Sequence, residues 1–346
     1  MLGFTISTLL AISHEETSAG SQGSKLLRSS ALNTLDCLIR FVADADALAF
    51  FLPGTVSGLT KALVAASGVR PNVGAGPGGT GADGVEFALS SMASILSCVL
   101  NDSLYESELG DSAEGEGANA LQSALGSLVA RSIDDQLESN AKNMSRDMND
   151  ENASVSPANA GKDLKVVRDK EWLSLASSRV EAALLATIPP LASHQRATVR
   201  LATGKMASSV LKHCAKVLGA KTRRRMMECL LTLAGDSWAQ VSTPILEDLR
   251  SLDNLGYVVR ADLEAIIKDD LSNIADTLRD SSDKAVGHLQ RLLIALEFAG
   301  ARRLKETLFA RPSSREHLCS TIAECCLLYT SPSPRDATLS RMPSSA

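Results

Sequence analysis

Residues 223–252 read RRRMMECLLTLAGDSWAQVSTPILEDLRSL, with apolar side chains at helical spacing on both sides of one glycine turn. The spacing predicts a helix over Arg223–Ala234 and a second helix over Ala239–Leu252. Gly235, Asp236 and Ser237 form the predicted turn and supply a side chain suited to cap the second helix. Two helices joined by so short a turn lie antiparallel, so this stretch predicts an antiparallel helix pair.

The same pattern extends upstream of residue 223. A helix is predicted from about Leu173 to Ile188, where Pro189 and Pro190 are expected to stop it. The next helix carries an apolar stripe of Val199, Met206, Val210 and Val217. Further upstream, the pattern predicts a helix pair over residues 25–66 and another over 85–100 and 118–137.

Two more helices are predicted downstream. The first has an apolar face, and the second is expected to pack beside it through a stripe of its own. No strand pattern of similar strength competes in this region. The two faces are Leu263, Ile266, Ile267, Leu271, Ile274 and Leu278 in the first helix, and Val286, Leu289, Leu293 and Leu296 in the second.

Composition agrees with an all-α class. Apolar residues make up 45% of the 346 residues and aromatic residues only 3%, so the core is built from small aliphatic side chains that suit helices packed on helices. The helix pairs recur about every 40 residues, a period typical of HEAT and armadillo repeats. The sequence therefore predicts a HEAT/armadillo-like, TPR-class, right-handed α-solenoid of stacked antiparallel helix pairs.

Four regions follow from the composition along the chain. Residues 1–138 are predicted to hold helical repeats with a Gly-rich loop at 68–84 and an acidic loop at 106–117, and residues 139–162 to form a disordered linker. Residues 163–325 are predicted to hold further HEAT-like repeats. Residues 326–346 lack a helical period, resemble translated adapter sequence, and are left out of the fold prediction.

Charge and cysteine usage exclude several classes of function. The net charge of −5 gives no general reason to expect nucleic-acid binding. No stretch is expected to approach the roughly 18 apolar residues of a membrane span, so no membrane insertion is predicted. The seven cysteines follow neither a disulfide framework nor a zinc-site spacing, which favours a reducing compartment.

No motif predicts chemistry, so the expectation is a protein without catalytic residues, cofactor or metal. The Gly-rich loop lacks the strand and the Gly-Lys-Ser/Thr ending of a phosphate-binding loop. The carboxylates from Glu106 to Glu116 lie among Gly and Ser, where nothing rigid would hold them in catalytic geometry. A helical domain of a larger enzyme remains an alternative, because a catalytic module could lie elsewhere in the parent protein.

One basic cluster is the candidate partner-binding surface. Lys205, Lys212 and Lys216 fall on one flank of a predicted helix, and a run of arginines follows at Arg223, Arg224 and Arg225. The alternative, which is favoured, is that these residues only solvate a ridge and interact with helix ends.

Two tryptophans begin predicted helices and are the largest side chains in the repeat region. Trp172 opens the helix that precedes Pro189, and Trp238 opens the helix that follows the Gly235 turn. A ring in this position can anchor one repeat against the next or act as a binding hot spot. Packing is the favoured role for both.

Three segments resemble one family. They are Phe51–Leu63 (FLPGTVSGLTKAL), Arg196–Leu201 (RATVRL) and Glu228–Val241 (ECLLTLAGDSWAQV). Together they are similar to the first Tel-two-interacting protein family, the large solenoid subunit of the Triple-T co-chaperone complex, over about residues 25–255. Within them, Thr198-Val199-Arg200 and Asp236 followed by Val241 resemble two elements of HEAT repeats.

The resemblance implies a non-enzymatic scaffold. Its implied partners are the other Triple-T subunits, kinases related to phosphatidylinositol 3-kinase, and chaperone machinery; its implied role is the maturation and stability of those kinases. The chain then resembles an internal fragment of a larger protein of the cytoplasm, and secondarily of the nucleus. Another α-solenoid adaptor, such as a nuclear transport receptor or a trafficking scaffold, fits the same periodicity.

Overall fold

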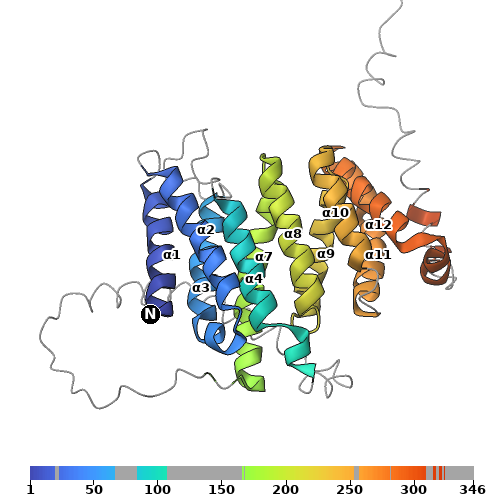
Figure 1. Ribbon diagram of the computed structural model, residues 1–346. Helices are drawn as coiled ribbons and strands as arrows, with labels where there is room; N and C mark the ends of the chain where they lie inside the picture. The colour runs from blue at the N-terminus through green and yellow to red at the C-terminus, as the bar shows by residue number, and fades with distance from the viewer. Residues whose placement is uncertain are drawn as a thin grey trace, which may run out of the picture. The chain divides into compact units, whose positions relative to one another are not determined.

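The computed structural model describes residues 1–19, 23–66, 84–106, 166, 168–252, 257–280, 282–308, 315–316, 319–321 and 323 (Figure 1). Within these ranges every element of regular structure is a helix, which confirms the predicted all-α class. The predicted loops at 68–84 and 106–117 lie outside the described residues except for Gly84 and Glu106. The helix at 118–137, the linker at 139–162 and the tail at 326–346 lie outside them entirely.

The chain divides into two compact units. Unit 1 comprises Met1–Leu191 and His213–Thr222, and unit 2 comprises Ala192–Lys212 and Arg223–Ala346.

Unit 1 begins with four helices that stack in pairs. They are α1 (Leu2–Ser18), α2 (Lys25–Val42), α3 (Ala45–Ala66) and α4 (Val85–Val99). Helix α1 packs against α2 and α3, and α4 packs against the same two helices (Figure 1). The predicted pair at 25–66 and the helix at 85–100 are confirmed, whereas α1 is a helix of the fold that the sequence analysis did not predict.

Helix α2 shows how the sequence specifies these elements. The Ser24 side chain accepts a hydrogen bond from the Leu27 N–H at 3.2 Å and so caps the start of the helix. The helix ends at Ala43, whose φ of 42° is left-handed. The side chains on its inner face recur at three- and four-residue steps, and all are buried: Arg28, Ala31, Leu32, Leu35, Asp36 and Ile39.

Within unit 1, Tyr105 and Arg168, which flank residues 106–167, are in direct contact. The Arg168 guanidinium lies over the Tyr105 ring, with Cζ 5.9 Å from the ring centroid, and its Nη2 lies 2.6 Å from Asp46 Oδ1 in α3. The buried Tyr105 hydroxyl donates to the Val99 carbonyl at 2.9 Å. Tyr105 and Arg168, which are 63 positions apart in the sequence, therefore lie side by side.

A second long-range contact in unit 1 starts from the short 3-10 helix η2 (Asp102–Leu104). The Asp102 carboxylate accepts hydrogen bonds from the backbone N–H groups of Lys216 and Val217, each at 3.0 Å. Burial raises the pKa of Asp102, and these hydrogen bonds offset part of that rise. One side chain thus holds the turn that follows residue 214.

Helix α7 (Lys170–Ala192) extends past the point at which the sequence predicted its end. Pro189 and Pro190 lie inside the helix, which continues to Ala192. Each proline removes a helical donor, but its fixed φ suits helical backbone, so the last turn remains helical around them. The expectation that Pro189 and Pro190 stop the helix is therefore wrong by one turn.

Unit 2 is built from most of α8 (Ala197–Cys214) and α9 (Ala220–Ala234), with α10 (Ala239–Leu252), α11 (Tyr257–Asp280) and α12 (Ser282–Leu308). The Arg223–Ala234 and Ala239–Leu252 helices and the turn between them are confirmed. Helices α8 and α10 approach closely, because a Cβ atom added at Gly204 would overlap Ile245 Cδ1. Buried apolar side chains fill this unit, including Val199, Met206, Val210, Leu230, Leu233, Val241, Ile245, Leu249, Ile266 and Ile267.

Helix α12 packs through a different face from the predicted one. Leu292, Ala295 and Ala299 are buried, whereas Val286, Leu289 and Leu293 of the predicted packing stripe are exposed. A kink at Gly300, where φ is 73°, interrupts the helix. Alanine side chains are small and let two helices approach closely, which favours packing through the side with Ala295 and Ala299 over the side with Leu289 and Leu293.

Two helical stretches reach the length and hydropathy of a membrane span, so the expectation that no stretch approaches this length is wrong. They are Ala45–Ala65 and Val85–Leu104, of which 39% and 44% is buried in the fold. Many small, weakly apolar residues make up these windows, which is why inspection for unbroken apolar runs passes over them. Core helices of globular proteins meet the same criterion, so length and composition alone do not place either helix in a bilayer.

Candidate functional site

The polar contacts of unit 2 begin with Arg200 in α8. Its guanidinium binds both carboxylate oxygens of Asp236, with Nε–Oδ2 at 2.6 Å and Nη2–Oδ1 at 3.1 Å. Nη1 donates to the backbone carbonyls of His194 and Gln195 at 2.8 and 3.0 Å. One side chain therefore fixes the turn before α8 to the turn before α10, in the bidentate geometry for which arginine is suited.

Asp236 is held as a carboxylate in this arrangement. Burial would raise its pKa, but the Arg200 hydrogen bonds and the Trp238 N–H, which donates to Oδ1 at 2.9 Å, outweigh burial and lower the pKa below its usual value. Sequence analysis had singled out Arg200 and Asp236 as HEAT-like elements, and the structure brings the two together.

Two further ion pairs connect helices two places apart in the chain. Lys212 in α8 lies 3.0 Å from Asp248 in α10, and Arg223 in α9 lies 2.9 Å from Asp262 in α11. In each pair a basic residue binds an aspartate 36 or 39 residues further along the chain. The side chains of Arg223 and Asp262 are only 15% and 12% exposed, so this pair is part of the packing between α9 and α11.

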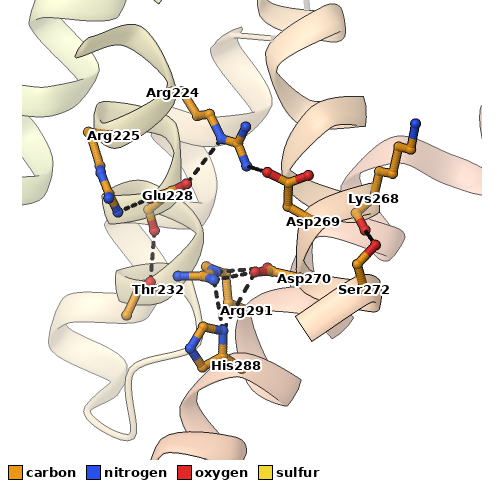
Figure 2. A network of polar contacts seen from close by, with 10 residues as sticks. All are labelled: Arg224, Arg225, Glu228, Thr232, Lys268, Asp269, Asp270, Ser272, His288 and Arg291. Atoms are coloured by element: carbon orange, nitrogen blue, oxygen red, sulfur yellow. Dashed lines mark hydrogen bonds and ion pairs between the residues drawn. The ribbon is translucent and has the colours of Figure 1, made fainter. Parts of the chain in front are cut away.

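The arginines that follow Arg223 enter a network around Glu228 (Figure 2). Glu228 Oε1 lies 3.2 Å from Arg224 Nε, and Glu228 Oε2 lies 2.8 Å from Arg225 Nη1. Arg224 Nη2 also pairs with Asp269 in α11. Two of the three arginines thus share one carboxylate on their own helix.

A more buried pair joins α11 to α12 in the same view (Figure 2). Arg291 Nε donates to Asp270 Oδ2 at 2.8 Å, and Arg291 Nη2 binds the other oxygen. His288 Nδ1 lies 2.9 Å from the same arginine and 3.6 Å from Asp270 Oδ1. The Asp270 side chain is 7% exposed, so the pair is a structural contact inside unit 2.

These contacts involve most of the predicted partner-binding cluster. Lys212, Arg223, Arg224 and Arg225 all form ion pairs within unit 2. Lys205 is exposed and forms no ion pair with the described residues. The prediction that Lys216 shares a helical flank with Lys205 and Lys212 is wrong, because α8 ends at Cys214 and Lys216 lies in the following turn. There its backbone N–H donates to Asp102.

The sequence analysis missed the acidic partners of this cluster. Asp248, Asp262 and Asp269 carry no local signal, because each binds a base on a different helix. Only a repeat register, with bases on one helix aligned to acids about 40 residues later, could have indicated them. Partner binding by the basic cluster remains a prediction. In the structure, Lys212, Arg223 and Arg224 stabilise contacts between helices.

Trp238 is the most exposed aromatic side chain of the turn region. It is 59% exposed, so the favoured packing role is wrong for this residue; Trp172 is half-buried. Its backbone N–H binds Asp236, and its carbonyl accepts from the N–H groups of Val241 and Ser242 at 2.8 and 3.0 Å. The backbone is thus fixed while the ring remains available at the surface.

Two buried cysteines, Cys214 and Cys229, are poorly suited to form thiolates. Burial raises the pKa of the Cys214 thiol, and the pKa of the Cys229 thiol rises to about 12. In the part of the chain that the structure describes, no group of three or more His, Cys, Asp and Glu side chains is placed to hold a metal ion.

Helix pairs joined by ion pairs between helices two places apart in the chain define an α-helical repeat protein of the solenoid class. Residues 1–237 match the model of the TTI1 N-terminal TPR domain, so the chain belongs to the TTI1 family. This confirms the predicted family and the α-solenoid fold class; the match begins before residue 25 and ends before α10. No curated protein and no solved structure matched the chain.

Proposed function

We propose that this chain is a non-enzymatic interaction scaffold in the Triple-T co-chaperone complex, where it supports the maturation and stability of kinases related to phosphatidylinositol 3-kinase. Its partners are then the other Triple-T subunits, those kinases and chaperone machinery. The proposal includes no nucleic-acid partner and no membrane insertion, and it places the protein in the cytoplasm and nucleus. The observation that carries it is the family match over residues 1–237.

The geometry of unit 2 supports a scaffold role. Its charged side chains join helices to one another, as Arg200 joins Asp236 and Arg291 joins Asp270, and this keeps helix surfaces in fixed register. A rigid array of this kind engages a partner through many modest contacts spread over a large area. Such binding requires neither a deep pocket nor a catalytic group.

The test is direct binding to purified Triple-T subunits, with a Ran-type GTPase as the negative control. The scaffold proposal predicts that the full chain co-elutes with at least one subunit and does not bind the GTPase. Binding to the GTPase alone would favour a nuclear transport receptor instead. Absence of binding to every subunit would overturn the assignment to this complex.

The kinase role needs a separate measurement. Cells depleted of their own TTI1-family protein are expected to lose phosphatidylinositol-3-kinase-related kinases, and the protein that contains this chain is expected to restore their levels. The matched control is the same protein without the residues corresponding to 197–252, which removes α8–α10. Equal rescue by both proteins would show that this part of the scaffold is not needed for kinase stability.

A further inference from the structure

Helix α12 carries an apolar seam on the side that faces away from its packing contacts. Val286, Leu289 and Leu293 are 53%, 43% and 56% exposed, and Leu296, which is half-buried, continues the line at the next step. The adjoining side of the helix, with Leu292 and Ala295, is buried. The helix therefore has two apolar sides, of which the described residues of unit 2 cover only one.

The spacing of the seam specifies the shape of what covers it. Val286, Leu289, Leu293 and Leu296 follow one another at steps of three, four and three residues, the a and d positions of a heptad. Side chains at this spacing form the ridge that a second α-helix receives as knobs into holes. The seam spans about 15 Å, or three helical turns, at the rise of an α-helix.

The ends and edges of the seam fit a helical occupant. A Cβ atom added at Gly287 would meet nothing within 4 Å, so a neighbouring backbone can approach beside Val286. Gly300 ends the regular helix beyond the seam. At its exposed edge lie Gln290 and Glu297, and Glu297 forms no ion pair with the residues that the structure describes.

We propose that the seam Val286–Leu289–Leu293–Leu296 is a docking surface for an amphipathic α-helix of a partner protein. That helix presents leucine-like side chains at heptad spacing and a Lys or Arg opposite Glu297, because a flanking base would pair with the exposed Glu297 carboxylate. The surface continues the helix-on-helix packing already seen between α11 and α12. This inference rests on the scaffold function proposed above and states where such a scaffold takes hold of a partner.

The first test uses the full chain and a synthetic peptide of about three heptads with Leu at a and d and Lys at e and g. Fluorescence anisotropy is expected to show binding, and a peptide with Ser at a and d to show none. Leu289→Glu combined with Leu293→Glu is expected to weaken binding at least about tenfold, as for central residues of an interface. Equal affinity for this variant would overturn the proposal.

The matched control is Leu175→Glu on α7, because Leu175 is 53% exposed and lies outside the seam. This variant is expected to bind the peptide as the parent chain does; equal loss in it would show nonspecific hydrophobic binding and overturn the proposal. Placing the photo-crosslinking residue benzoylphenylalanine at position 293 gives a readout that does not depend on how well a charged variant folds. A crosslink to the peptide is expected, and its absence counts against the seam.

Other occupants give distinct results. A dimer that the Leu289→Glu and Leu293→Glu changes abolish would show a second copy on the seam. Stronger peptide binding after removal of residues 309–346 would show that the chain covers the seam itself. Either result would overturn the proposal that a partner's helix occupies the seam. If Triple-T subunits bind the seam variant and the parent chain equally, the seam fails and the scaffold proposal stands; if they bind neither, the scaffold proposal fails.

Discussion

Arg200 and Asp236 are separated by 36 positions in the sequence, yet they form a two-point ion pair with Nε–Oδ2 at 2.6 Å and Nη2–Oδ1 at 3.1 Å. Their side chains are 13% and 9% exposed, so solvent screens the pair little. The pair joins two successive helix–turn–helix segments of unit 2, and its loss should affect the whole unit.

Replacement of the arginine tests this directly. Arg200→Ala leaves the Asp236 carboxylate shielded from solvent without its base, and we expect the free energy of unfolding to fall by about 3 kcal/mol. Lys205→Ala on the same helix is the control, with an expected change within about 0.5 kcal/mol for an exposed residue. Urea unfolding followed by circular dichroism measures both. Equal effects of the two changes would contradict a special role for Arg200.

The same pair predicts a dependence of stability on acid. Because the pKa of Asp236 is lower in the folded chain than its ordinary value of 3.8, its stabilising effect is complete above that value and is lost as pH falls through the folded pKa. We therefore expect the stability difference between the parent chain and Asp236→Asn to be largest above about pH 5 and to shrink below pH 4.

The pH dependence of stability expected from Asp102 has the opposite sign to that expected from Asp236. Its folded pKa is raised, chiefly by burial, so its contribution is complete below the ordinary value and is lost as pH rises through the folded pKa. The stability difference between the parent chain and Asp102→Asn should accordingly shift in the opposite direction over the same titration. Parallel curves for the two asparagine variants would contradict both assignments.

Asp269 and Asp270 are neighbours that differ in burial and therefore in their expected importance. Asp270→Ala leaves the largely buried Arg291 without its carboxylate, and we expect it to cost about 3–5 kcal/mol of unfolding free energy. Asp269 is 53% exposed, and Asp269→Ala should cost at most about 1 kcal/mol. Thermal melts of the two variants provide the comparison, and a larger effect at position 269 would refute the burial argument.

Four of the described cysteines should divide into two groups by reactivity. Cys37 and Cys319 are exposed, whereas Cys214 and Cys229 are buried and have raised thiol pKa values. We expect maleimide to label Cys37 and Cys319 in the native chain and to reach Cys214 and Cys229 only after unfolding. Peptide mass spectrometry locates the label. Rapid native labelling of Cys229 would show that the α9 core opens readily.

The sequence predicted the helix pairs well because their apolar residues repeat at helical spacing, as in Leu263, Ile266 and Ile267 of α11. It did not predict α1, whose first charged side chain is Glu15 and whose apolar side chains therefore lie on more than one side. It placed the end of α7 too early, because local proline rules give way to packing in a last helical turn.

The site was harder to predict than the fold. Periodicity shows which residues of α12 share a side, but the choice between Leu293 and Ala295 as the packing side depends on how closely α11 approaches. The exposed ring of Trp238 and the pairing of Arg223 with Asp262 depend equally on neighbours from distant parts of the chain. The HEAT-like resemblance at Arg200 and Asp236 was the one local signal that pointed to an actual contact.

Because Arg168 stacks on Tyr105, the geometry of unit 1 at this contact does not depend on how many residues lie between the two. Since both borders meet at one point, residues can be added or removed between them without changing the distance that the helices must bridge. For protein engineering, a fluorescent domain or an affinity tag inserted between Tyr105 and Arg168 is expected to leave this contact in place, and the chain ends stay unmodified.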